Sequence, residues 1–308
     1  MDSPLARVIL ATLGGYLLIL VLLSVYGWLV EEYPRRPAPL ANSVRIQHQI
    51  HHQEAIDALR MFSRLPKSEK NAIKESLYKD LISLEQWLEH LRETNFQMIC
   101  MGELHEESTR SFLAEEFFAK VGADVLLLEA TPGKLRRLIK RMEAGRDYYP
   151  LLGSDIINIL HTAKDMNPDI RIHGIEETDG QAQQGRGHSN SRDQNIAKNF
   201  WAAFEPGFCH IILFGALHCT NEPNWLFHNL GGQASPSLKD EMFNVRVLGE
   251  HQNGPLEAFV YFLDETEVKK GHFVIADTRL LHPRIYELFP LLSRQTLMKY
   301  RSLVVFRP

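Results

Sequence analysis

The sequence predicts an α/β fold, in which a mostly parallel central sheet is flanked by helices and is preceded by an N-terminal transmembrane helix and a helical segment. Three observations support this. Short apolar runs alternate with helical stretches from residue 96 onward, an uncharged apolar run spans residues 8–30, and two amphipathic stretches lie between these regions. We therefore divide the chain into a transmembrane anchor (1–33), a linker and helical segment (34–94) and an α/β domain (95–308).

The predicted anchor, VILATLGGYLLILVLLSVYGWLV, carries no charge from residue 8 to residue 30. A helix needs about 20 apolar residues to cross a bilayer. Tyr26 and Trp28 suit the interfacial zone, and the following EEYPRRPAP ends the helix with charge and proline. A cleavable signal peptide is the alternative, although the apolar core of such peptides is usually only about 7 to 15 residues long.

The distribution of positive charge does not decide the orientation of the anchor in the membrane. Arg7 precedes the apolar run, while Arg35 and Arg36 follow it, so neither end has a clear positive excess. We expect a single-pass membrane protein with its folded domain outside the cytoplasm.

The helical segment contains two stretches, at about 43–63 and 67–92. The second has a single apolar stripe, which predicts packing against the domain that follows, with a coiled-coil partner as the alternative. The stripe consists of Ile73, Leu77, Leu81, Leu84, Leu88 and Leu91.

Within the α/β domain, the pattern predicts strands at 96–102, 123–130, 169–177 and 209–218, with helices near 107–120, 132–144 and 191–204. Strands that are apolar at every position are covered on both faces, which indicates a parallel sheet. Further strands, some of them antiparallel at an edge, are expected in MFNVRVLGE (242–250), LEAFVYFLDE (256–265) and RSLVVFRP (301–308). The glycine-rich stretch 179–191 is expected to form a mobile loop over a site.

The composition excludes several classes of protein. A net charge of -4 with 44% hydrophobic residues gives no indication of a nucleic-acid partner. Cys100, Cys209 and Cys219 are odd in number and far apart, so we expect neither a disulfide framework nor a zinc ribbon, and we interpret Cys100 and Cys209 as small buried hydrophobic residues.

Polar residues follow each of the four expected strands of the parallel sheet. In an open α/β sheet, ligands bind beyond the carboxyl ends of the strands, so these residues are the candidates for a site. Two of the four endings have the form Gly-x-x-His, where glycine permits a close approach of the backbone. The endings are Gly102-Glu103-Leu104-His105, Glu129, His173-Gly174-Ile175-Glu176-Glu177 and Gly215-Ala216-Leu217-His218.

Acids and imidazoles at one edge of a sheet suit two chemistries. They can bind a divalent transition metal that activates water, with His105, His218, Glu103 and Glu129 as ligands, or a histidine oriented by a carboxylate can act as a general base. The chain has no GxSxG elbow, no P-loop and no GxGxxG after a strand, which excludes the common serine hydrolase, NTPase and dinucleotide patterns.

The order GELH, LLLE, SRDQNIAKN and FGALH resembles the erythromycin esterase and ChaN-like superfamily, which includes the Tiki and TraB proteins. The resemblance covers residues 95 to 230. It implies that Glu103, His105, Glu129, Arg192 and His218 line the pocket, with Asp193 as the acidic partner of Arg192. The chain departs from the pattern at Cys219, at Asn195-Ile196 where many members have Met-Ala, and in lacking a lipoprotein cysteine.

The resemblance leaves the activity divided. Erythromycin esterases are hydrolases in which a histidine activates water, Tiki proteins are metal-dependent proteases, and ChaN is a haem-binding lipoprotein. Our first hypothesis is a hydrolase of esterase or metal-dependent peptidase type, acting on a small molecule or a peptide. In it, Arg192 binds an anionic or carbonyl oxygen, and the alternative for Arg192 is a structural ion pair with Asp193 or Glu129.

Two other classes of function stay open. A haem-binding protein would need an axial ligand, for which His188, Tyr148 and Tyr149 are candidates. An interaction scaffold would use the helices before residue 93, where a metal would bind His48, His51 and His52. The basic run KLRRLIKR (134–141) would contact anionic lipid if the domain faced the cytoplasm. The oligomeric state is left open.

Overall fold

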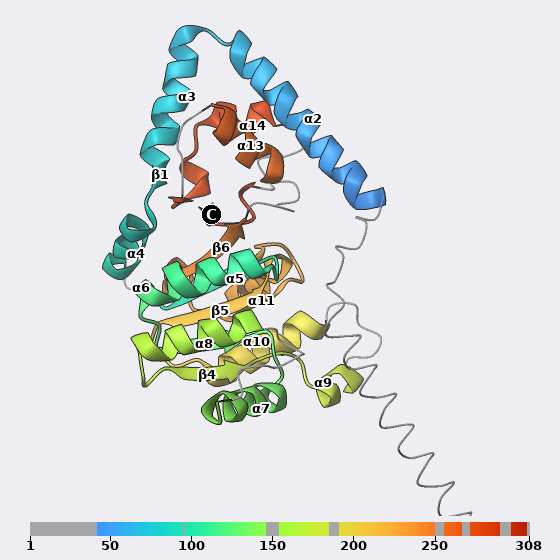
Figure 1. The fold of residues 1–308 in the computed structure, drawn as a ribbon, viewed down its shortest axis with the longest axis vertical. Coiled ribbons are helices and arrows are strands. Elements are labelled where there is room, and N and C mark those ends of the chain that lie inside the picture. Colours follow the sequence, from blue (N-terminus) through green and yellow to red (C-terminus); the bar gives the residue numbers. More distant parts are fainter. Residues whose placement is uncertain are drawn as a thin grey trace, which may run out of the picture. The chain divides into compact units, whose positions relative to one another are not determined.

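The computed structural model describes residues 42–94, 96–145, 154–184, 191–249, 256–266, 272–289 and 297–306. Residues from His48 onward form one compact unit. Within the described residues of this unit, an eight-stranded sheet has the order β1-β7-β8-β6-β2-β5-β3-β4. Figure 1 labels β4, β5 and β6 of this sheet among the helices that flank it. The prediction of an α/β fold with one mostly parallel sheet flanked by helices is confirmed.

The parallel part of the sheet runs from β8 to β4, and the antiparallel strands β7 and β1 extend it at one edge. The strands are β1 (Leu81–Ile82), β2 (Met98–Glu103), β3 (Val125–Leu128), β4 (Arg171–Gly174), β5 (His210–Gly215), β6 (Met242–Leu248), β7 (Phe273–Ile275) and β8 (Ser302–Val305).

Two hydrophobic cores lie on opposite faces of the sheet, because side chains alternate along each strand. Along β2, Met98 and Cys100 belong to the first core, and Ile99 and Met101 to the second. The first core is covered by α2 (Asn42–Arg64), α3 (Lys67–Asp80), α10 (Ser191–Ala203), α11 (Leu226–Gln233), α13 (Glu257–Glu265) and α14 (Pro283–Leu288). The second is covered by α4 (Leu84–Glu93), the continuous α5 (Glu107–Phe112), η1 (Leu113–Phe118) and α6 (Ala119–Val121), and by α7 (Pro132–Glu143) and α8 (Ser154–Met166).

The helix predicted over 67–92 is interrupted. Ser83 caps a new helix, since its hydroxyl accepts from the backbone N–H of Gln86 and the Gln86 side chain accepts from the backbone N–H of Ser83. The two residues before this capping box form β1, which pairs with β7. The apolar stripe packs on the domain as expected, with its first half in one core and its second half in the other. The domain expected at 95–308 thus takes in part of the preceding segment.

The strand predicted at 256–265 is wrong, because this segment forms α13. Its buried residues Ala258, Phe259, Phe262 and Leu263 recur at three- and four-residue steps, which places them on one face of a helix. The long loop predicted at 179–191 is also partly wrong, because it begins with the helix α9 (Asp179–Gln184) and ends in the first residue of α10.

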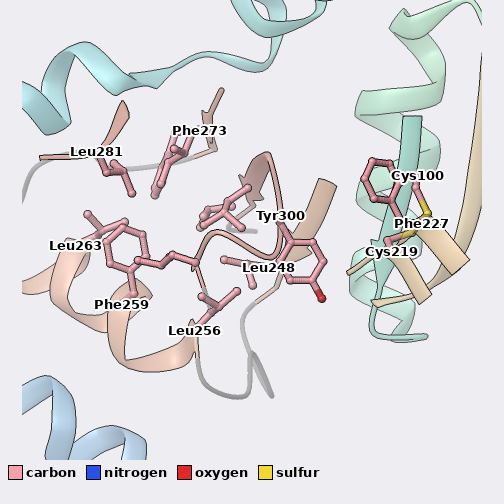
Figure 2. Packing of buried hydrophobic residues seen from close by; sticks show 14 of the residues in the cluster. Cys100, Cys219, Phe227, Leu248, Leu256, Phe259, Leu263, Phe273, Leu281 and Tyr300 are labelled. Atoms are coloured by element: carbon pink, nitrogen blue, oxygen red, sulfur yellow. A yellow bond between two sulfur atoms is a disulfide. The ribbon is translucent and has the colours of Figure 1, made fainter. Parts of the chain in front are cut away.

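Cys100 of β2 and Cys219 form a disulfide, whereas no disulfide was expected; Cys100 is buried as expected. Cys219 ends the short 3₁₀-helix η2 (Ala216–Cys219), which directly follows β5. Both cysteines are fully buried in the first core, close to Phe227 and Tyr300 (Figure 2). Cys209 is free and half-buried, and burial raises the pKa of its thiol to about 12.

No helix among the described residues has the length and apolar character needed to span a membrane. The anchor predicted at 8–30 lies outside the described residues.

Candidate functional site

The two Gly-x-x-His segments lie side by side. Strands β2 and β5 are parallel neighbours, and Glu103 pairs with Gly215 in the register. Gly102 allows this approach, since a Cβ atom there would lie 2.9 Å from the Cα atom of Ala216. Gly215 likewise lies against His105, where a Cβ atom would be 2.9 Å from Nε2. Each glycine therefore makes room for the other segment.

His105 and Glu103 form the first carboxylate–imidazole pair of the site. The Nδ1 atom of His105 is 2.9 Å from Oε1 of Glu103, and the histidine has a left-handed backbone with a φ of 58°. Glu103 is buried and also accepts from Nε of Arg110, at 3.0 and 3.1 Å. Arg110 on α5 thus orients the carboxylate of Glu103, which in turn orients the imidazole of His105.

The electrostatics of this pair favour a charged acid. Burial would raise the pKa of Glu103, but the hydrogen bonds from His105 and Arg110 outweigh it and hold the pKa below its ordinary value. The hydrogen bond to Glu103 raises the pKa of His105 above its ordinary value, against the opposing effect of burial. A histidine with this environment binds a proton more readily than one in water.

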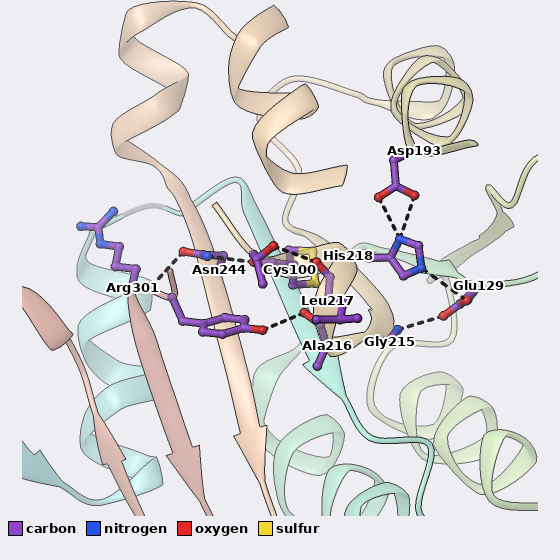
Figure 3. The surroundings of a disulfide bond; sticks show 12 residues. Cys100, Glu129, Asp193, Gly215, Ala216, Leu217, His218, Asn244 and Arg301 are labelled. Atoms are coloured by element: carbon purple, nitrogen blue, oxygen red, sulfur yellow. Dashed lines mark hydrogen bonds and ion pairs between the residues drawn. A yellow bond between two sulfur atoms is a disulfide. The ribbon is translucent and has the colours of Figure 1, made fainter. Parts of the chain in front are cut away.

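His218 and Asp193 form the second pair. The Nδ1 atom of His218 lies 2.8 and 3.0 Å from the two carboxylate oxygens of Asp193, and both residues are buried. Figure 3 shows the imidazole between Asp193 and Glu129. The rings of Phe214 and Trp225 pack edge-on against it, each with a centroid separation of 5.6 Å. Asp193 was expected to partner Arg192, but it binds His218 instead.

Glu129 and Arg192 join the two pairs. Glu129 accepts from the backbone N–H of Gly215 at 2.8 Å, and its Oε2 is 3.5 Å from Nε2 of His105. Arg192 Nη2 donates to Glu129 at 2.9 Å, and Nη1 lies 3.1 Å from Nε2 of His218. The ion pair of Arg192 with Glu129, expected as the structural alternative, is therefore present.

The structure also brings Glu176 to Arg192. Nε of Arg192 donates to Glu176 at 3.0 Å and Nη2 donates at 2.6 Å. These bonds raise the pKa of the Arg192 guanidinium, which is thereby kept charged and oriented. Of the third strand ending, Glu176 joins the site through its contacts with Arg192, whereas His173 lies in a separate cavity beside α7.

All five predicted site residues line one cavity of about 600 Å³, a size that fits a small ligand. Other residues contribute to the site that the sequence did not single out as site residues. Glu176 appeared there only as part of a strand ending, and Arg110 has no signal in the sequence. Arg246 is a charged residue in the middle of an apolar strand, which is a signal that sequence reasoning can use. Trp225 and Tyr300 are further wall residues, as are Thr220, Glu222, Leu256 and Lys299.

The donors of the site are not arranged for a metal ion. Among the described residues, no group of three or more His, Cys, Asp or Glu side chains is placed to hold one. The guanidinium of Arg192 lies between Glu129 and His218, where a cation shared by those two residues would have to bind.

Several candidate residues for the haem-binding and scaffold functions lie outside the described residues. Tyr148, Tyr149 and His188 lie outside the described residues, as do the side chains of His48 and His51. His52 packs edge-on against Tyr261, with ring centroids 5.0 Å apart. In the basic run on α7, Leu135 and Leu138 are buried, while the charged residues are exposed.

No family model and no curated protein matches the chain. Two solved structures resemble it weakly. A protein from Bacillus cereus has a TM-score of 0.44 and 11% identity over 77% of this chain and 97% of its own. A chain described under bacterial protein toxins has a TM-score of 0.37 and 14% identity over 67% of this chain and 47% of its own. Likeness at this level carries no argument about function.

Proposed function

We propose that the protein is a hydrolase in which His105 activates a water molecule for attack on a carbonyl carbon. The observation that carries this proposal is the convergence of two carboxylate–imidazole pairs, Glu103–His105 and Asp193–His218, on one cavity. A histidine oriented by a buried carboxylate is the arrangement that general-base catalysis requires.

His105 is the better base of the two histidines. Its side chain is 46% exposed, whereas that of His218 is 9% exposed. Nδ1 of His105 lies 2.9 Å from both Oε1 of Glu103 and Nη2 of Arg110. In the tautomer that donates Nδ1–H to Glu103, Nε2 carries the lone pair and takes the proton of water. The resulting imidazolium lies between Glu103 and Glu129, and both carboxylates stabilise its charge. The same proton then passes to the leaving oxygen or nitrogen.

Arg192 supplies the positive charge on the other side of the reacting carbonyl. Its guanidinium stays charged and is held by Glu176 and Glu129, so it is preorganised for the oxyanion that forms in the transition state. His218 contacts the same guanidinium and fixes its position. This route needs no metal ion, and the arrangement of donors favours it over the metal-assisted route.

The experiment is a hydrolysis assay of the full-length protein with neutral 4-nitrophenyl esters and with fluorogenic peptides. We expect turnover by the wild type and a loss of about 10²- to 10⁴-fold in His105→Ala. His90→Ala is the matched control, because His90 is exposed on α4 and lies outside the cavity. A folded His105→Ala variant with native turnover would sink the assignment.

Metal content separates the two routes. We expect the full-length protein, purified without chelator, to hold no stoichiometric transition metal by mass spectrometry and to keep its activity in the presence of EDTA. Stoichiometric metal that disappears in both His105→Ala and His218→Ala would instead establish the metal-assisted route.

We also propose that the chain is related to the erythromycin esterase and ChaN-like superfamily, and that its folded domain is anchored to a membrane on the side away from the cytoplasm. The disulfide supports a domain outside the cytoplasm, because structural disulfides persist in oxidising compartments. Protease treatment of sealed cells or vesicles tests this location. Cleavage of the domain from the outer side is expected, and full protection there would place the domain in the cytoplasm.

A further inference from the structure

Arg246 is a charged residue within a buried strand. It lies on β6, between β8 and β2, and pairs with Gly102 in the register. Its exposed fraction is 6%. A buried guanidinium normally has a carboxylate partner and satisfied N–H groups, since an isolated buried charge is costly.

Asn244, the neighbouring polar residue on the same face of β6, has hydrogen-bond partners for its side chain. Asn244 Nδ2 donates to the carbonyl of Cys219 at 2.8 Å, and Oδ1 accepts from the backbone N–H of Arg301 at 2.9 Å. Arg246 differs, because its Nη1 atom is buried without a hydrogen-bond partner among the described residues. Burial also lowers its pKa, against the weaker influence of Tyr300, Glu106 and Glu103.

Arg246 lines the same cavity as His105 and His218. The other cations of the cavity wall that the structure describes have carboxylate partners. Lys299 Nζ is 2.9 Å from Glu222, and Arg192 binds Glu129 and Glu176. Arg246 has no carboxylate partner within ion-pair distance among the described residues, so its guanidinium can bind an anionic group of a ligand in addition to the oxyanion contact that we propose for Arg192.

Other residues that line the cavity are apolar or already have hydrogen-bond partners. Leu104, Leu217, Trp225 and Leu256 line the cavity, and the hydroxyl of Tyr300 donates to the carbonyl of Ala216 at 3.0 Å. A ligand that fills this cavity therefore meets an apolar surface, the guanidinium of Arg246, and the charged groups and histidines of the proposed site.

We infer that the cavity binds an amphiphilic substrate whose anionic oxygen group, a carboxylate or a phosphate, is held by Arg246 while its apolar body packs on Trp225 and Leu256. The planar fork of a guanidinium matches both kinds of anion. This inference rests on the proposed function in one respect, namely that the bond to be cleaved is the part of the substrate that lies at His105.

Calorimetric titration of the full-length protein tests the subsite without any reaction. The probes are hexanoate, hexyl phosphate and neutral hexanamide, which share an apolar chain. We expect at least one anion to bind about tenfold or more tightly than hexanamide. Preference for hexanoate or for hexyl phosphate then distinguishes the carboxylate from the phosphate. Equal binding of all three probes by the wild type overturns the inference, and this comparison needs no variant.

Arg246→Met removes the charge and keeps a similar volume, and Arg246→Lys keeps the charge without the fork. We expect Arg246→Met to abolish the preference for the anion and Arg246→Lys to retain part of it. Arg60→Met is the control, because Arg60 is exposed on α2, where its side chain pairs with Asp57. A folded Arg246→Met variant that still prefers the anion overturns the inference.

The melting temperature of the ligand-free protein adds a second readout. A binding arginine without an ion pair is replaced by methionine at no loss of stability, whereas a structural arginine is not. We expect Arg246→Met to melt at or above the wild-type temperature, and a clear decrease would assign Arg246 a structural role. The two proposals are tested separately. Binding of the anion without any hydrolysis would support the subsite at Arg246 and contradict the proposed hydrolase activity.

Discussion

Gly215 lies so close to His105 that a methyl group on the glycine would come within 2.9 Å of the Nε2 atom of the imidazole. A second contact of the same length runs the other way, from Gly102 to the backbone of Ala216. In the first case the obstacle is the end of a side chain, and in the second it is backbone. The two glycines should therefore respond differently to the same substitution.

We expect Gly215→Ala to lower activity and Gly102→Ala to lower stability. In Gly215→Ala the imidazole is displaced, and kcat/KM should fall about tenfold or more while the melting temperature changes little. In Gly102→Ala the strand and η2 must separate, which should cost about 1 to 3 kcal/mol. Thermal denaturation and ester hydrolysis measure the two effects. Gly133→Ala is the control, because nothing lies within 4 Å of its added Cβ.

The pH dependence of catalysis follows from the raised pKa of His105. A general base must be neutral, so kcat/KM should rise with pH and reach half of its plateau above pH 6.5, the ordinary value. Glu103→Gln removes the charge that stabilises the imidazolium, so the midpoint should move to lower pH. An unchanged midpoint in Glu103→Gln would show that another group titrates.

The same raised pKa has a consequence for stability, with the opposite trend. Because the folded state binds the His105 proton more tightly than the unfolded state, the stabilising contribution is complete below pH 6.5 and is lost as the pH rises through the folded pKa. Urea denaturation of the wild type and His105→Asn should show a smaller difference between them at high pH than at low pH. Glu103 has a lowered pKa, so it stabilises the folded state at pH values above the ordinary pKa of a glutamate. This stabilisation is lost as the pH falls through the pKa of the folded state.

Asp193→Asn should uncouple His218 from its acid without unfolding the domain. The amide keeps the shape of the carboxylate but not its charge, so the imidazole loses the group that fixes its proton on Nδ1. We expect kcat/KM to fall at least about tenfold, with a circular dichroism spectrum like that of the wild type. The control is Asp179→Asn, which removes an exposed acid at the start of α9 and should leave activity unchanged.

Removal of the disulfide should destabilise the domain. Cys100 and Cys219 are separated by 119 positions, and cross-links of this kind contribute about 2 to 4 kcal/mol. We expect the Cys100→Ala/Cys219→Ala variant to unfold at a lower urea concentration than the wild type. Non-reducing peptide mapping should recover the linked pair in the wild type and in Cys209→Ser. A wild-type chain with three free thiols would contradict the cross-link.

Much of the sheet could be predicted because its strands are buried on both faces. Such strands appear as continuous apolar runs, and the polar residues that follow them mark the carboxyl edge where Glu103, Glu129 and His218 meet. The role of each histidine could not be predicted in this way. Whether His218 is held by Asp193 or by Glu129 depends on how α10 packs, which spacing along the chain does not specify.

Other features escape the sequence for identifiable reasons. The disulfide joins two of three cysteines that lie far apart in the chain, so parity and spacing argue against it. The segment at α13 is apolar at nearly every inner position, which fits a buried strand as well as a helix with Phe259 and Phe262 inward. Arg110 lies in the first turns of an amphipathic helix, where an arginine is ordinarily a surface residue.

The backbone of His105 bears on how this protein can be engineered. Residues with a side chain avoid a φ near 58°, and holding one there costs about 1 to 3 kcal/mol. Glycine would adopt the same conformation without this cost. A library selected only for heat resistance would therefore tend to replace His105, and with it the group that we propose to activate water. Thermostabilised versions of this protein should be selected under a simultaneous requirement for activity, with position 105 held fixed.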